Sequence, residues 1–352
     1  MRVAIIISRI DQLGPIILIQ NLVNSLRSFT DLSLNVFYID KDINDGIKMN
    51  VPVERLNRRN FCFADFDIIH TTGIRPDLFA FLHRKKIKYH ISTIHNFVFE
   101  DLAFTYNKLI SWFFGNIWLI LLNRADKLVC VSAALKEYYA IWFKIEKLVV
   151  IYNGIGESDN SASPDKNTIK FIDSFHSKGL TVLGFAGILT RRKGVDQILR
   201  LLITEKDFAF VIIGDGKENT ALMSEAKRLK VFDRCFFCGF KENAFSYFRY
   251  FDLFVMPSRS EGFGMALVEA IQQRVPVVCS NLKVFQELFN DSEVYYFKRD
   301  DQQSLTEAVK RAAFEKGTMK TDMAFERYQN NYTSKLMAES YYDLYCSVGA
   351  HN

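Results

Sequence analysis

Two glutamates and two glycines lie close together in residues 256–271, which read Met-Pro-Ser-Arg-Ser-Glu-Gly-Phe-Gly-Met-Ala-Leu-Val-Glu-Ala-Ile. The apolar run that ends at Pro257 predicts a buried strand, and the residues after Gly264 favour a helix. Open α/β sheets bind ligands at such strand–turn–helix junctions, because glycines let the backbone come close and a new helix offers N–H groups and a partial positive charge.

Seven residues separate Glu261 from Glu269. Glu261 precedes the predicted helix and could bond a polar group at its start, whereas Glu269 could accept two hydroxyl groups of a ribose. Spacing alone equally allows Glu261 to be a helix cap and Glu269 to be an ordinary surface residue. Both alternatives stay open on this spacing.

A basic turn, Arg-Arg-Lys at residues 191–193, follows a predicted strand over residues 180–186. Cations and helix-start amides in such a turn can hold a diphosphate, although a solvated basic turn has the same composition. Gly214 and Gly216 end another predicted strand and by themselves indicate only a tight turn. The first strand is followed by a single glycine, Gly14, where a nicotinamide-binding protein would carry G-x-G-x-x-G, which disfavours a dehydrogenase.

Apolar, β-branched runs alternate with helical periodicity along most of the chain, and this pattern predicts parallel sheets covered on both faces. The predicted strands are residues 2–8, 33–38, 68–71, 89–94, 127–131, 148–152, 180–186, 208–214, 234–238, 253–256, 275–279 and 294–297. The predicted helices include residues 16–26, 133–142, 196–202, 219–229, 264–273 and 305–314. The fold class is therefore α/β, with two doubly wound, Rossmann-like domains.

The length of 352 residues also suits two domains. Residues 157–168 are polar and rich in Ser, Asn and Asp, which predicts a linker. We therefore expect an N-terminal domain over residues 1–156 and a C-terminal domain over residues 169–322. The aromatic, helical tail over residues 323–352 is expected to cross back towards the N-terminal domain.

Composition excludes several classes of protein. Hydrophobic residues make up 49% of the chain, which excludes intrinsic disorder. The net charge of +5 is too small for a nucleic-acid groove, and all of it lies in residues 1–155, which hold 19 Lys and Arg against 14 Asp and Glu. Six scattered cysteines indicate reduced thiols, and the N-terminus does not resemble a signal peptide, so a cytoplasmic protein is expected.

Residues 257–270, Pro-Ser-x-x-Glu-Gly-Phe-Gly-x-x-x-x-Glu-Ala, resemble the signature of the family 4 glycosyltransferases, which are retaining enzymes of the GT-B fold. Residues 182–195 resemble the phosphate-binding strand and loop of the same family. Further stretches resemble that family in the expected order, at residues 67–70, 150–154, 211–216 and 237–240. The resemblance is dense over residues 180–300 and covers most of the chain.

This resemblance implies two Rossmann-like domains that face each other across a cleft, and a sugar transferase that uses a nucleotide-sugar donor. A UDP-sugar is favoured and a GDP-sugar is the alternative. Glu269 would bind the ribose, Arg192 and Lys193 the diphosphate, and Glu261 the sugar. The other donor-binding residues that the resemblance implies are Gly14, Gly214, Gly216, Phe240, Gly262, Phe263, Gly264 and Met265.

His95 is similar in position to the family's first-domain histidine, so the resemblance implies two catalytic residues, His95 and Glu261. The acceptor would attack the face from which the diphosphate leaves, and that phosphate would accept the proton. No Asp-x-Asp motif stands in a suitable loop, so neither a metal nor a cofactor is expected. Ile188 stands where many members have arginine, so Arg191 or Arg192 would supply that charge, and Arg274 stands where a glycine usually ends the helix.

The acceptor is expected to be a glycan or a lipid-linked molecule of cell-surface polysaccharide or lipopolysaccharide biosynthesis. Basic residues 83–88 and the aromatic run at residues 112–122 suggest peripheral attachment to the inner face of the cytoplasmic membrane. A buried helix and an exposed basic run are the plainer alternative. A nucleotide-sugar epimerase of the same fold and a non-catalytic nucleotide-sugar-binding subunit remain rival functions, although both glutamates and His95 are present, which disfavours the subunit.

Overall fold

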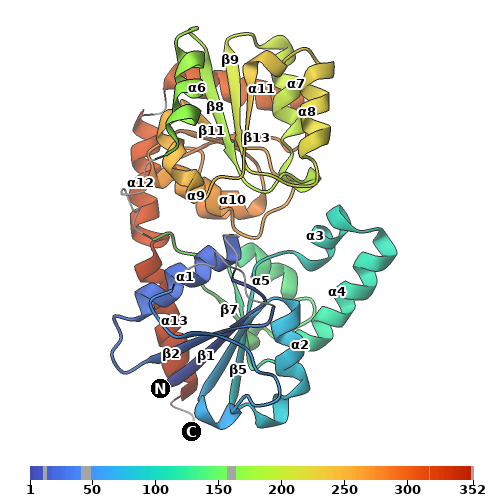
Figure 1. The fold of residues 1–352 in the computed structure, drawn as a ribbon, viewed down its shortest axis with the longest axis vertical. Coiled ribbons are helices and arrows are strands. Elements are labelled where there is room, and N and C mark those ends of the chain that lie inside the picture. Colours follow the sequence, from blue (N-terminus) through green and yellow to red (C-terminus); the bar gives the residue numbers. More distant parts are fainter. Residues whose placement is uncertain (11–13, 41–48, 157–163, 317, 350–352) are drawn as a thin grey trace. The chain divides into compact units, whose positions relative to one another are not determined.

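The computed structural model describes residues 1–10, 14–40, 49–156, 164–316 and 318–349. The chain divides into two compact units, the first formed by Met1–Glu157 with Asn331–Asn352 and the second by Ser158–Asn330 (Figure 1). Most of the predicted linker, residues 157–163, lies outside the described residues. Its last residues already begin a helix, because the Asp165 carboxylate accepts hydrogen bonds from the amides of Asn167 and Thr168.

The first unit is built on a seven-stranded sheet in the order β3-β2-β1-β4-β5-β6-β7, and its strand pairs are parallel. The strands are β1 (Arg2–Ile7), β2 (Ser33–Tyr38), β3 (Val53–Arg55), β4 (Ile68–Thr72), β5 (Tyr89–Ile94), β6 (Lys127–Cys130) and β7 (Leu148–Val150). Sequence patterning missed β3, because this edge strand has three residues and none of them is buried.

The helices of the first unit are α1 (Gly14–Leu26), α2 (Ile74–Leu82), α3 (Val98–Thr105), α4 (Lys108–Leu122), α5 (Ala133–Tyr139) and α13 (Ser334–Gly349). α13 packs beside α1 (Figure 1) and is tied to the sheet through His70. The His70 ring shares hydrogen bonds of 2.7 Å with the Tyr345 hydroxyl and 2.7 Å with Thr93 Oγ1. Burial lowers the pKa of His70 to about 3, so the ring is a neutral structural link. The expected packing of the C-terminal helix on the first domain is confirmed.

The second unit holds a six-stranded sheet in the order β10-β9-β8-β11-β12-β13, again with parallel pairs. The strands are β8 (Thr181–Ala186), β9 (Phe208–Ile213), β10 (Cys235–Gly239), β11 (Leu253–Met256), β12 (Val277–Ser280) and β13 (Tyr295–Phe297). The helices are α6 (Lys166–His176), α7 (Asp196–Thr204), α8 (Asn219–Arg228), α9 (Met265–Gln272), α10 (Lys283–Leu288), α11 (Gln302–Glu315) and α12 (Thr318–Asn331). Both sheets are therefore doubly wound, as the sequence predicts.

Short 3₁₀ turns connect several of these elements: η1 (Phe63–Asp65), η2 (Arg84–Lys86), η3 (Ile145–Lys147), η4 (Arg191–Lys193), η5 (Phe232–Arg234) and η6 (Ala244–Tyr250). In the second sheet β8 lies between β9 and β11, so the chain reverses its direction of winding beside β8. The loops that follow β8 and β11 consequently leave the same edge of the sheet, side by side, which is where doubly wound sheets bind ligands.

Arg274 shows how a departure from the usual family pattern is accommodated. It follows α9 with φ of +56°, the left-handed conformation that glycine normally provides at a helix end. Its guanidinium lies over the Phe325 ring, 3.9 Å from the ring centroid, and pairs with Asp322 at 2.5 Å. These contacts with α12 offset part of the backbone strain.

Candidate active site

The basic turn η4 is packed directly against the loop between β11 and α9. Gly194 ends this turn with φ of +67°, and a Cβ atom there would lie 2.1 Å from the Pro257 carbonyl oxygen. The buried Gln197 side chain donates to the same carbonyl at 2.9 Å. Only glycine fits at position 194, and this close approach brings the cations of the turn to the glutamate of the facing loop.

Glu261 is the centre of a buried ion cluster. Its Oε1 accepts from Lys193 Nζ at 2.5 Å and from Ser258 Oγ at 2.7 Å, and its Oε2 accepts from Arg192 Nη1 at 3.2 Å. Burial by itself would raise the pKa of Glu261, but the charges of Lys193 and Arg192 outweigh it and hold the pKa below its usual value. Glu261 is therefore an ionised counter-ion for two cations, and it does not cap α9, whose N-cap is Gly264.

Glu269 lies in α9 in a different electrostatic setting. Among the described residues, none forms a hydrogen bond or an ion pair with its carboxylate. Burial raises the pKa of Glu269 to about 7, and the charge of Lys193 only partly opposes this effect. A half-buried carboxylate without a partner, near a cation, is suited to accept hydroxyl groups from a ligand.

The glycines of the site serve close packing. A Cβ atom on Gly214 would lie 2.0 Å from the Gly187 carbonyl oxygen, and one on Gly216 would lie 2.4 Å from that of Leu189. The turn after β9 is thus pressed against the loop after β8. Gly264 has φ of +104°, and a Cβ atom there would meet the Phe285 ring at 2.5 Å.

Four of the remaining donor-binding candidates also lie on the second unit, shortly after Glu261 or just after β10. Gly262 and Phe263 are buried, Met265 opens α9, and the Phe240 side chain is 59% exposed beyond the end of β10. An exposed aromatic ring at this edge of the sheet can stack on a planar ligand.

His95 and Gly14 belong to the first unit. His95 follows β5, and its Nε2 shares a hydrogen bond of 2.8 Å with Oγ1 of Thr72, the last residue of β4. Burial lowers the pKa of His95 to about 4, so its imidazole is neutral at physiological pH. Gly14 opens α1 after β1. Both positions therefore follow strands at the carboxyl edge of the first sheet.

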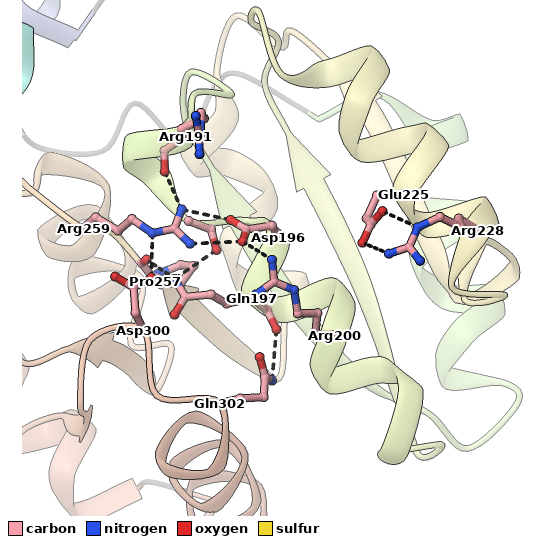
Figure 2. Close-up of polar contacts among 11 residues, drawn as sticks. Arg191, Asp196, Gln197, Arg200, Glu225, Arg228, Pro257, Arg259, Asp300 and Gln302 are labelled. Atoms are coloured by element: carbon pink, nitrogen blue, oxygen red, sulfur yellow. Dashed lines mark hydrogen bonds and ion pairs between the residues drawn. The ribbon is translucent and has the colours of Figure 1, made fainter. Parts of the chain in front are cut away.

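Sequence reasoning anticipated the cations and glutamates but missed the residues that hold them. Ser258 bonds Glu261, and Arg259 links the β11–α9 loop to Asp196 and to the basic turn (Figure 2). The sequence features that could have predicted these residues are the polar Pro-Ser-Arg-Ser run before Glu261 and the acidic first residue of α7. No cluster of His, Cys, Asp and Glu that could hold a metal ion occurs within the part of the chain that the structure describes.

Comparison with known proteins identifies relatives along the whole chain. The family model described as "Glycosyl transferases group 1" matches residues 166–330, and "Glycosyltransferase Family 4" matches residues 27–158. The O-antigen biosynthesis glycosyltransferase WclY of Escherichia coli is 32% identical over 355 aligned residues, which cover 98% of each chain. The lipopolysaccharide core biosynthesis mannosyltransferase LpsB of Rhizobium meliloti is 31% identical, over 48% of this chain and 49% of its own.

Solved structures share the fold at low sequence identity. Sucrose-phosphate synthase from Thermosynechococcus elongatus aligns with a TM-score of 0.84 and 16% identity over the full length of both chains. Anabaena HepE in complex with UDP and glucose aligns with a TM-score of 0.78 and 17% identity, over 99% of this chain and 100% of its own. Fold and relatives together define the class of this protein, a glycosyltransferase with the GT-B fold. The chain belongs to glycosyltransferase family 4.

Proposed function

We propose that this enzyme transfers a sugar, with retention of configuration, from a nucleotide-sugar to a glycan or lipid-linked acceptor. The observation that carries the proposal is the pairing of Lys193 and Arg192 with Glu261, near the carboxylate of Glu269, which pairs with none of the described residues. A UDP-sugar is the favoured donor, and the UDP named with HepE, a protein of the same fold, supports that choice over GDP.

Lys193 and Arg192 would bind the donor's diphosphate. A diphosphate that enters the turn adds negative charge to a cluster whose two cations already share one carboxylate. Glu261 keeps both cations oriented before the donor arrives, so little reorganisation is needed when charge develops on the leaving diphosphate. The loop residues Gly262–Met265 would line the sugar, Phe240 would lie against the base, and Glu269 would accept the ribose hydroxyls.

The proposed transfer breaks the bond between the anomeric carbon and the diphosphate oxygen and forms a bond from that carbon to the acceptor oxygen. The acceptor hydroxyl attacks the face from which the diphosphate leaves and passes its proton to a phosphate oxygen. No protein nucleophile, metal or cofactor is required for this balance. The neutral imidazole of His95 would hydrogen-bond the donor from the first unit.

Thermal stability measured against UDP, GDP, ADP, CMP and dTDP tests the donor site. We expect one nucleotide, UDP first among them, to raise the melting temperature, and Glu269→Ala to abolish the rise. No response to any nucleotide would contradict the proposed site. Product analysis with the responding nucleotide-sugar then separates transfer to an acceptor from epimerisation of the donor, and a protein that binds donor but releases no product would be the non-catalytic subunit.

The name of the WclY relative supports O-antigen or other surface-polysaccharide biosynthesis as the pathway. We further propose that the protein acts in the cytoplasm, at the membrane's inner face. No helix in the described ranges is long and apolar enough to cross a membrane. α4 is only partly the buried helix of the plainer alternative: Trp118 is buried and donates to Asp77 at 2.7 Å, while Leu109 and Trp112 are 81% and 64% exposed. The basic residues Lys85 and Lys86 of η2 are also exposed. Peripheral contact with an anionic membrane through α4 is therefore part of the proposal.

Sedimentation with phosphatidylglycerol-containing vesicles tests this contact. Binding at low salt, weakened by Trp112→Ser and by high salt, is expected. Phe314→Ser is the matched control, because Phe314 is 88% exposed on α11 of the second unit. Absence of vesicle binding at low salt, or equal losses in both variants, would contradict membrane contact through α4.

A further inference from the structure

Arg259 is held by an unusually complete set of hydrogen bonds for a loop residue. Its Nη1 and Nη2 donate to the two carboxylate oxygens of Asp196, both at 3.0 Å, and its Nε donates to Asp300 Oδ1 at 2.6 Å. The Arg259 side chain is only 19% exposed. Bidentate pairing of this kind fixes the plane of the guanidinium as well as its position.

Two further bonds join Arg259 to the backbone of the basic turn. Its Nη1 donates to the Arg191 carbonyl at 2.6 Å (Figure 2). Its own backbone N–H donates to the Arg192 carbonyl at 2.7 Å. Both acceptors belong to η4, whose side chains at 192 and 193 pair with Glu261. The loop that carries Glu261 thus holds the turn at its backbone and at its charged side chains.

Three consecutive cations in one short turn repel one another, so their orientation is costly to maintain without external support. From these contacts we infer that Arg259 is a positioning residue, which fixes the backbone of η4 so that Arg192 and Lys193 are oriented in advance for a diphosphate. The inference rests on the proposed donor site and extends it by one residue and its partner, Asp196. Four of the five guanidinium N–H groups are already used within the protein, so Arg259 acts through the turn and not as a phosphate ligand.

The second unit contains a matched control pair. Arg228 also pairs with a carboxylate through two bonds: its Nε and Nη2 donate to the two oxygens of Glu225 at 2.8 and 2.6 Å, within α8 (Figure 2). Its side chain is 69% exposed, and its side-chain hydrogen bonds with described residues reach no part of η4. Arg228→Lys therefore removes the same kind of bond without touching the turn.

The test compares the affinities of UDP and uridine for the full-length wild type and the variants Arg259→Lys, Asp196→Asn and Arg228→Lys. Lysine keeps the charge but cannot reproduce the fork or reach both backbone and carboxylates. We expect Arg259→Lys and Asp196→Asn to weaken UDP binding about tenfold, as loss of charge-assisted hydrogen bonds does. Uridine, which has no phosphate, should bind within about twofold of its wild-type affinity in every variant. Arg228→Lys should leave the affinities of both ligands unchanged.

If Arg259 only stabilised the fold, Arg259→Lys would lower the melting temperature without a selective loss of affinity for UDP over uridine. Normal UDP affinity in Arg259→Lys, or equal losses for UDP and uridine, would overturn the inference. Asparagine is nearly isosteric with aspartate, so Asp196→Asn tests the positioning role if Arg259→Lys does not fold. A wild type that binds GDP instead is tested with GDP and guanosine, and a wild type that binds neither diphosphate overturns the donor site itself.

Discussion

Glu261, in the loop before α9, and Glu269, within α9, are the same residue type, yet their surroundings shift their pKa values in opposite directions. Two cations and a hydroxyl hold Glu261 ionised, whereas Glu269 is left by burial with a pKa of about 7. A carboxylate kept without a partner costs stability in the empty protein. Such a cost is typical of binding residues, which recover it when the ligand arrives.

Glu269→Gln should reveal this cost as a pH-dependent gain in stability. The folded-state pKa of about 7 lies above the ordinary glutamate value of 4.5, so the wild type loses stability as pH rises through this interval, and the full cost is present above pH 7. We expect the variant to melt roughly 3 °C above wild type at pH 8, with the difference vanishing towards pH 4.5. Thermal unfolding at several pH values without nucleotide is the measurement.

Glu326→Gln, at an exposed position of α12, is the control and should show no such trend. A difference that stayed constant with pH would mean that the Glu269 carboxylate carries no electrostatic cost in the empty site.

At the scale of elements, the site depends on the turn η4 lying against the β11–α9 loop. A comparison of Gly194 with Gly179 distinguishes the effect of this packing from the effect of the left-handed backbone alone. Both are left-handed, with φ of +67° and +73°, but only Gly194 faces an obstacle, the Pro257 carbonyl, while nothing lies within 4 Å of a Cβ atom on Gly179.

Gly179→Ala should therefore cost about 1 kcal/mol, the strain of a left-handed alanine. Gly194→Ala should cost more than about 3 kcal/mol, because backbone must move, and nucleotide binding should be lost with it. Urea unfolding of both variants measures the free energies. Equal destabilisation of the two would show that the turn can shift away from the β11–α9 loop without penalty.

At the scale of the whole molecule, histidines whose pKa is lowered by burial are unevenly shared between the units. Burial lowers the pKa of His70 and His90 to about 3 and that of His95 to about 4, and all three lie in the first unit. The single histidine of the second unit, His176, has a side chain 38% exposed. Asp77 in the first unit acts in the opposite direction, because burial raises its pKa to about 6.

The first unit should consequently unfold at a higher pH than the second during acidification. A histidine whose folded pKa is lowered binds its proton only in the unfolded state, so stability is lost as pH falls from 6.5 towards 3. Three such groups outweigh one aspartate. All three tryptophans, at positions 112, 118 and 142, belong to the first unit, so their fluorescence reports its unfolding alone, while far-ultraviolet circular dichroism follows both units.

His90→Gln should move the fluorescence midpoint to lower pH, because the variant lacks one of the groups that take up a proton on unfolding. Nδ1 of His90 is buried without a hydrogen-bond partner among the described residues, so the substitution breaks no hydrogen bond at that atom. His176→Gln should leave the midpoint unchanged. Simultaneous transitions in fluorescence and circular dichroism would contradict independent acid sensitivity of the first unit.

The sequence by itself determined the order of elements and the class of fold, because hydrophobic periodicity depends on residues a few positions apart. β9, apolar at all six positions, was recognisable as a buried parallel strand. The short edge strand β3 and the start of α6 inside the predicted linker were not, since neither has an apolar pattern long enough to detect. The turn with Gly262 and Gly264 before α9 was also predicted from sequence alone, as a junction between a strand and a helix.

Only the tertiary structure decided how the site residues interact. Glu261 meets Lys193 across 68 positions of sequence, and Arg259 meets Asp196 across 63. The same holds for α4, whose nearly continuous apolar run does not reveal that Trp118 is buried and Trp112 exposed. Charge pairing, burial and pKa depend on which distant segments the folded sheet brings to one edge, and that proximity is absent from the local pattern of residues.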